Sequence, residues 1–143
     1  MDPLSGVASI IAVIQIAEEV LGLLGSYISA VKDAKRDIER LSAEVLALRN
    51  ILRNLEDLKQ EPGSAKLTTL NLLSKPGGLM EKCLGELKEL ATRLDPGQGD
   101  TAIRRVGWRT LKWPFSSKDV DKKILIVERY KTAFNLALTT DNT

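Results

Sequence analysis

DAKRDIERLSAEVLALRNILRNLEDLKQ, residues 33–60, is the stretch that decides the fold class. Its apolar residues recur at steps of three and four, which places them on one face of a helix. These residues, called here the heptad seam, are Ile38, Leu41, Val45, Leu48, Leu52 and Leu55. Charged residues occupy the other faces. We therefore predict a helix over 33–60 that packs on partner helices and turns a solvated back outward.

The preceding segment, LSGVASIIAVIQIAEEVLGLLGSYISAV at residues 4–31, predicts a second long helix, over 3–31. Asp2 and Pro3 suit the cap and the first helical position, and no Lys or Arg occurs before Lys32. The broad apolar face contains Leu4, Val7, Ile11, Ile14, Leu21, Leu24 and Ile28. A narrow stripe of small and polar residues contains Ser9, Gln15, Glu18, Glu19, Gly22 and Ser26.

The rest of the chain also has helical periodicity. It predicts helices over 79–95, 101–113 and 117–139 and a short helix over 67–73. Pro-Gly pairs separate the earlier helices, and Trp113-Pro114-Phe115 precedes the last one. Ser116 and Asp119 form a start for the last helix that resembles a capping box, with Asp in place of the usual Glu. We expect an all-α chain, a single bundle of four to five helices over 1–143. Its polar ending suggests the N-terminal part of a longer protein.

Residues that carry catalysis or bind metals are scarce. The sequence has no histidine, and its single cysteine, Cys83, can form neither an internal disulfide nor a zinc site. We expect Cys83 at the edge of the core. No Gly-rich phosphate loop follows a strand. The sequence therefore predicts no enzyme, with no catalytic residue, no metal and no cofactor.

The charge is small in total but unevenly placed. The net charge is +2, yet residues 102–123 contain seven basic side chains against two acidic ones. The N-terminus lacks the basic region of a signal peptide, so we expect a cytoplasmic protein. The basic segment interleaves cations with tryptophans: Arg104, Arg105, Trp108, Arg109, Lys112 and Trp113.

Two interpretations of this basic segment remain open. Tryptophan prefers the membrane interface, and each basic side chain adds roughly 1 kcal/mol near an anionic surface, which favours phospholipid binding. Alternatively, both tryptophans pack on the bundle while the cations stay solvated. Nucleic acid is disfavoured as a partner, because the total charge is modest and no recognition motif is present.

The N-terminal helix also allows two interpretations. Its 28 residues span roughly 42 Å, longer than a hydrocarbon core of about 30 Å. Glu18 and Glu19 near its middle would each cost about 2.5–3.5 kcal/mol in lipid, which argues against a permanent anchor. It is either the central core helix of a soluble bundle or a helix that enters a membrane when several copies shield the polar stripe. The two are compatible if the helix is released on activation.

The sequence closely resembles the fungal HeLo-like domain. The similarity rests on MDPLSGVASIIAVIQIAEEVLGLLGSYISAVKDA at 1–34, LSAEVLALRNILRNLEDL at 41–58, LKWPF at 111–115 and ERYKTAFNLALTTD at 128–141. HeLo-like domains stand at the N-terminus of fungal NOD-like (STAND) receptors and related cell-death proteins. They are similar to HeLo domains and to the four-helix bundle of the mixed-lineage kinase domain-like pseudokinase.

The resemblance implies a cell-death effector that oligomerises on activation and permeabilises the plasma membrane through its N-terminal helix. The implied partners are further copies of the chain, an anionic phospholipid membrane, and a NOD-like receptor or an adjoining NACHT or amyloid-motif region. The implied location is cytoplasmic at rest and at the plasma membrane when activated. The alternative is a non-enzymatic docking module that uses the helix from Ile38 to Leu58 to recruit another helical domain.

Overall fold

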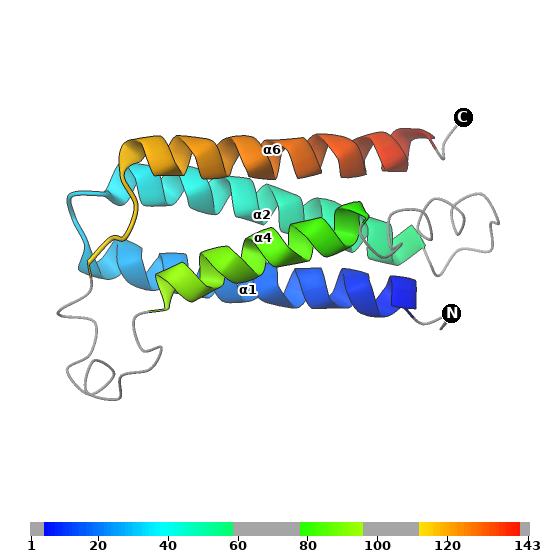
Figure 1. Cartoon of the computed structure of the whole chain (residues 1–143), viewed down its shortest axis with the longest axis horizontal. Helices are drawn as coiled ribbons and strands as arrows, with labels where there is room; N and C mark the ends of the chain where they lie inside the picture. Colours follow the sequence, from blue (N-terminus) through cyan, green and yellow to red (C-terminus); the bar gives the residue numbers. More distant parts are fainter. Residues whose placement is uncertain (1–4, 59–77, 96–111, 141–143) are drawn as a thin grey trace.

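The chain is an all-α bundle (Figure 1). The computed structural model describes residues 5–58, 78–95 and 112–140, with side chains described for 10–57, 78–95 and 112–137. The helices in this part are α1 (Ser5–Ala30), α2 (Lys35–Leu58), α4 (Leu79–Leu94) and α6 (Ser117–Thr140), and it contains no strand. The predicted fold class is confirmed.

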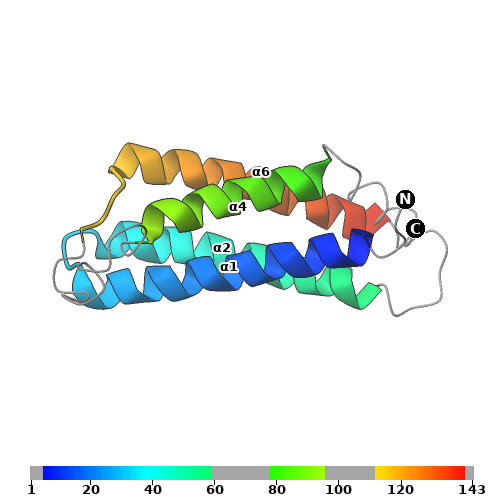
Figure 2. The same ribbon diagram turned by 60° about the horizontal axis from the view of Figure 1, so that its bottom comes forward.

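The helices form a four-sided bundle with three tight sides and one loose side. Helix α1 packs against α2 and α4, and α2 packs against α6. Helices α4 and α6 approach each other less closely along the fourth side. Figures 1 and 2 show α1 and α4 running in one direction and α2 and α6 in the other. The start of α1 and the end of α6 therefore lie at the same end of the bundle.

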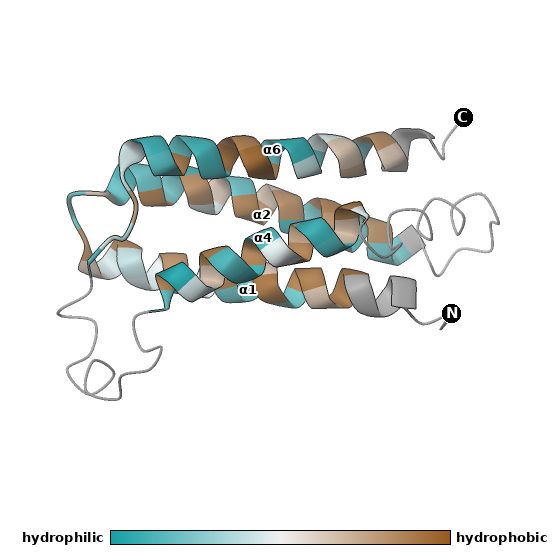
Figure 3. Cartoon of the chain, viewed as in Figure 1, coloured by the Kyte–Doolittle hydropathy of each residue, from teal (hydrophilic) through white to brown (hydrophobic). Residues whose placement is uncertain are grey.

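The heptad seam of α2 forms the centre of the core. Its six side chains are at most 1% exposed: Ile38, Leu41, Val45, Leu48, Leu52 and Leu55. Helix α4 adds a face with Met80, Leu87 and Leu94, and α6 adds Val120, Val127 and Phe134. No polar or charged side chain among the described residues is buried. Figure 3 shows that the first turns of α6 consist mostly of hydrophilic residues.

The start of α6 has the predicted capping geometry. The Ser116 N–H donates to Asp119 Oδ2 at 3.1 Å, and the Asp119 N–H donates to Ser116 Oγ at 3.1 Å. Both bonds satisfy N–H groups that have no partner within the helix. These hydrogen bonds hold the pKa of Asp119 below its ordinary value.

One predicted helix is wrong at its end. Lys112 and Trp113, the last residues of the predicted helix 101–113, lie in a non-helical segment over 112–116. Pro114 explains the difference, because proline pushes the preceding residue toward an extended conformation and lacks a backbone donor. The predicted helix 67–73 and residues 101–111 lie outside the described residues.

Candidate functional surface on α1

Helix α1 is the element with the least ordinary composition for a soluble bundle. Its stretch Ile10–Ala30 is long and apolar enough to cross a membrane by length and composition alone, a property that core helices of soluble proteins share. In the bundle, 39% of its most apolar window is buried. Neighbouring helices therefore cover only part of this apolar stretch.

The buried side of α1 is rotated relative to the apolar face named from the sequence. The residues turned into the core are Ile10, Val13, Ile14, Ala17, Val20, Leu24 and Tyr27, each at most 8% exposed. Of the named apolar residues, Ile14 and Leu24 are buried, Leu21 and Ile28 are half-buried, and Ile11 is 39% exposed. Leu4 and the side chains of Val7 and Ser9 lie outside the described residues. Ile11 is thus an apolar side chain presented to solvent by the resting bundle.

The polar stripe faces solvent. Gln15, Glu18, Glu19 and Gly22 are exposed, and Ser26 is half-buried. Glu18 accepts a hydrogen bond from Arg53 of α2, with 2.6 Å between Glu18 Oε1 and Arg53 Nη2. Arg53 is a partner that the sequence alone did not indicate, because the two residues lie 35 positions apart.

Gly22 and Gly25 of α1 are not required by the packing of the bundle. A Cβ atom added at Gly22 or Gly25 would meet nothing within 4 Å. One turn further along the helix, Ser26 Oγ donates to the Gly22 carbonyl at 3.3 Å and Ser29 Oγ donates to the Gly25 carbonyl at 3.4 Å. The end of α1 therefore exposes a surface of small residues whose hydroxyls are occupied by their own helix.

An aromatic cluster closes the bundle beside the end of α1. The Trp113 ring meets the Tyr27 ring edge-on at 5.2 Å between centroids, and it meets Phe115 at 5.3 Å. The Tyr27 hydroxyl donates to the Leu94 carbonyl at 2.8 Å, and burial, aided by Asp95, raises the pKa of Tyr27. Trp113 therefore packs on the bundle.

Only part of the predicted phospholipid-binding segment is described. Lys112 is exposed, and it shares an open hollow beside Trp113 with the carboxylates Asp33 and Asp37. Arg104, Arg105, Trp108 and Arg109 lie outside the described residues. The surface around the described end of this segment therefore carries both a cation and carboxylates.

A family model places the chain among known sequences. The model for the N-terminal region of the pigment biosynthesis cluster protein PigL matches residues 1–143. The chain belongs to this family. No curated protein and no solved structure matches it. The PigL N-terminal family suggests a fungal source, and the match is not to the HeLo-like domain.

In this member of the PigL N-terminal family, Cys83 is a core residue. Its side chain is fully buried, and the burial, with Glu86 nearby, raises the pKa of the thiol to about 12. The protonated thiol is a poor nucleophile at neutral pH. Within the described residues, no group of three or more His, Cys, Asp and Glu side chains is arranged to hold a metal ion.

Proposed function

We propose that this chain is a membrane-permeabilising effector domain whose α1 is stored in the bundle at rest and enters a membrane after activation. The observation that carries the proposal is α1 itself. It combines a membrane-length apolar stretch with an exposed face of glycines that the resting bundle does not need. The resemblance to HeLo-like domains supports the same role and implies execution of cell death.

Release of α1 from the bundle needs a membrane and several copies of the chain to offset its free-energy cost. Leaving the bundle would expose the core face of α1, where each large apolar side chain contributes about 1.5–3 kcal/mol. The sum approaches the whole stability of a domain of about 5–15 kcal/mol. A lipid phase restores this burial. Glu18 and Glu19 would then cost about 2.5–3.5 kcal/mol each unless other copies shield them.

Exposed small residues suit this shielding. Gly22 and Ser26 lie four apart on one face, as do Gly25 and Ser29. Small residues at this spacing let helices approach closely in lipid. On this proposal the partners are further copies of the chain, an anionic membrane, and a NOD-like receptor or adjoining NACHT or amyloid-motif region. The chain is cytoplasmic at rest and at the plasma membrane when active.

The docking alternative receives less support. It needs the heptad seam of α2 to be free for a partner, but the six side chains of that seam are at most 1% exposed. A partner that used the seam would have to displace α1 or α6. The proposal based on α1 also requires α1 to leave the bundle, but a membrane then replaces the burial that its core face loses.

Dye leakage from phosphatidylserine vesicles tests the proposal. The full chain is fused at its C-terminus to a domain that oligomerises when a small molecule is added. We expect leakage after oligomerisation and little before. Deleting residues 1–20 removes part of the core and is a poor variant, so Ile11→Asp is preferred, because Ile11 is 39% exposed in the bundle.

Leu125→Asp is the matched control, since Leu125 is 55% exposed on α6. We expect both variants to keep the helical spectrum and melting temperature. Only Ile11→Asp should abolish leakage. Equal leakage from both variants, or no leakage from the oligomerised parent chain, would sink the proposal.

The basic segment supplies a second test. Replacing Arg104, Arg105, Arg109 and Lys112 by glutamine should weaken binding to anionic vesicles roughly fivefold per residue, as expected for about 1 kcal/mol each. Binding to phosphatidylcholine vesicles should not change. Unaltered binding to anionic vesicles would exclude a role of this segment in lipid recognition.

A further inference from the structure

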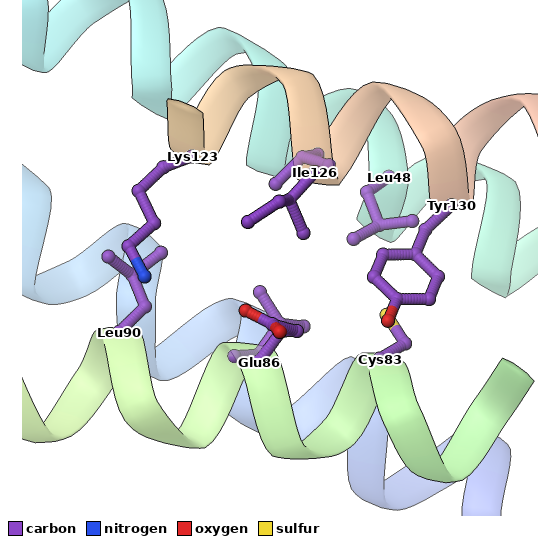
Figure 4. A pocket seen from close by; sticks show the side chains of 9 residues that line it. Leu48, Cys83, Glu86, Leu90, Lys123, Ile126 and Tyr130 are labelled. Atoms are coloured by element: carbon purple, nitrogen blue, oxygen red, sulfur yellow. The ribbon is translucent and has the colours of Figure 1, made fainter. Parts of the chain in front are cut away.

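The outer face of α6, directed away from the rest of the bundle, contains two exposed leucines. The inner side of α6 packs on α2, and Figure 4 shows Lys123, Ile126 and Tyr130 on the side that faces α4. Leu125 and Leu136 lie on the outer side and are 55% and 65% exposed. No other large apolar side chain among the described residues is as exposed as these two. Apolar surface that a bundle leaves uncovered on one face marks a site of interaction.

Beside Leu125 the outer face forms a shallow open hollow, called here the α6 hollow. Its volume is about 390 Å³, and it is lined by Leu125, Glu128, Arg129, Thr132 and Ala133. The first four stand at positions i, i+3, i+4 and i+7, the set that receives one side chain of a facing helix in knobs-into-holes packing. Four carbon groups of about 30 Å³ each, as in a leucine side chain, fit in this space. The α6 hollow can therefore receive an apolar side chain from another helix.

Leu136 is itself a side chain that fits the α6 hollow. It lies one turn beyond Thr132 on the same face, so a second α6 that runs in the opposite direction brings its own Leu136 to the hollow. Two-fold symmetry repeats this contact, because Leu136 of each copy enters the hollow of the other. Thr132 and Ala133 then lie at the symmetry axis, where their small side chains allow the two helices to approach closely.

The charges along α6 favour the same antiparallel pairing. Its outer face carries Lys118, Lys122 and Arg129, whereas its last turn contains no basic residue. The carbonyls at a helix C-terminus carry a partial negative charge that attracts cations. In an antiparallel pair, Lys122 of each copy lies beside the C-terminal end of the other α6, and the two Arg129 side chains stay roughly 10 Å apart along the helix axis. A parallel pair instead places each cation against its own counterpart.

We propose that the outer face of α6 binds a second copy of this chain as an antiparallel, two-fold pair, with Leu136 of each copy in the α6 hollow of the other. The pair belongs to the resting chain. It uses none of the exposed residues of α1, so it does not rest on the proposed membrane role. One helix packed on another buries less surface than the about 1,200–2,000 Å² of a stable interface, so the pair is weak and forms only at high concentration.

Sedimentation equilibrium of the full chain at roughly 10–1,000 µM measures this pairing. We expect a reversible equilibrium between monomer and dimer. Leu136→Asp should weaken the dimer at least tenfold. Leu46→Asp is the matched control, because Leu46 is also an exposed leucine, 41% exposed, but lies on α2. A parent chain that stays monomeric over the whole range, or equal weakening by both variants, would overturn the proposal.

Exchange of charge at Thr132 tests the position of the axis, because Thr132 faces its own counterpart there. Thr132→Lys and Thr132→Glu should each be monomeric alone, since like charges meet across the axis. An equimolar mixture of the two should form a heterodimer. The same two changes at Asn54, which is exposed on α2, are the control and should leave the parent equilibrium unchanged. Pairing of either Thr132 variant alone, or a mixture that stays monomeric, would exclude an axis at this residue.

Spin labels at Lys122→Cys distinguish the two orientations. The labels should be roughly 30 Å apart in the antiparallel pair, about 20 residues of helix, whereas a parallel pair would bring them to roughly 10 Å. Cys83 is fully buried, so the label reacts with the introduced thiol. Vesicles of phosphatidylserine distinguish the occupant. A parent chain that sediments as a monomer, yet loses vesicle binding on Leu136→Asp, would assign this face to lipid and refute the pairing.

Discussion

At the scale of single residues, Gly22 and Gly25 are costly to the resting bundle. Glycine within a helix loses more conformational freedom on folding than any other residue and lowers stability by roughly 0.5–1 kcal/mol relative to alanine. Neither position requires a missing side chain, because an added Cβ would meet nothing within 4 Å. Their presence is understandable if close approach to another helix matters in a different state.

Replacing either glycine by alanine tests separately the stability of the resting bundle and the close approach of helices in the membrane state. Gly22→Ala and Gly25→Ala should each raise the free energy of unfolding by about 0.5–1 kcal/mol, measured by urea denaturation. Both should reduce vesicle leakage after oligomerisation, since the added methyl groups hinder helix contact. A destabilised bundle would contradict the open space at these positions.

At the scale of single helices, local sequence patterns determine the buried face of α2 and the first residue of α6. The heptad seam of α2 turns every member into the core, and the exchange of hydrogen bonds between Ser116 and Asp119 begins α6. Both features follow from spacing within one helix. They therefore provide two tests that do not depend on the function.

Leu52 and Leu46 form a matched pair on α2. Leu52 is fully buried, and Leu46 is 41% exposed. Leu52→Ala should lower the free energy of unfolding by about 2–5 kcal/mol through lost burial and an internal cavity. Leu46→Ala should change it by less than about 1 kcal/mol. Chemical denaturation of the two variants checks this difference, and equal losses would mean that the seam has been placed on the wrong face.

The cap of α6 should make stability depend on pH in acid. Because the pKa of Asp119 is lowered in the folded chain, its ionised form stabilises the fold above the ordinary carboxyl pKa of 3.8. This contribution is lost as the pH falls through the lowered pKa. Asp119→Asn should therefore be less stable than the parent chain at pH 7, and the gap should shrink below about pH 4. Melting curves across this range measure the gap, and a gap independent of pH would contradict a cap based on the ionised group.

At the scale of the whole molecule, α1 is attached to the bundle mainly by apolar packing. The ion pair between Glu18 and Arg53 has side chains that are 45% and 55% exposed, so it contributes only roughly 0–1 kcal/mol. Lys131 and Glu44 form a less exposed pair between α2 and α6, with 2.9 Å between Nζ and Oε2. The ion pair that joins α1 to α2 is therefore weaker than the ion pair that joins α2 to α6.

Glu18→Gln tests the balance between bundle and membrane. It should change the free energy of unfolding by at most about 1 kcal/mol, because it removes an exposed pair. It should increase leakage from the oligomerised chain, since a neutral amide costs less in lipid than a carboxylate. Glu44→Gln is the control, as Glu44 contacts α6 rather than α1. Decreased leakage in Glu18→Gln alone would argue that Glu18 has a direct role in the membrane state.

Local pattern predicted much of the fold. The all-α class, the heptad seam, the approximate bounds of α1, α2, α4 and α6, and the Ser116–Asp119 cap depend on residues close together in the chain, and all appear in the structure. The buried face of α1 was less predictable. Ile10, Ile11, Val13 and Ile14 are all apolar, so composition alone barely distinguishes the side that meets the core.

Tertiary packing decided the remaining features, because each joins residues that are distant in sequence. It turned Ile11 outward, paired Glu18 with Arg53, and enclosed Trp113 between Tyr27 and Phe115. It also placed α4 and α6 less close together than the other neighbouring helices. Helical spacing determines which residues share a face, whereas the partner that covers each face is determined only when all the helices compete for the same core.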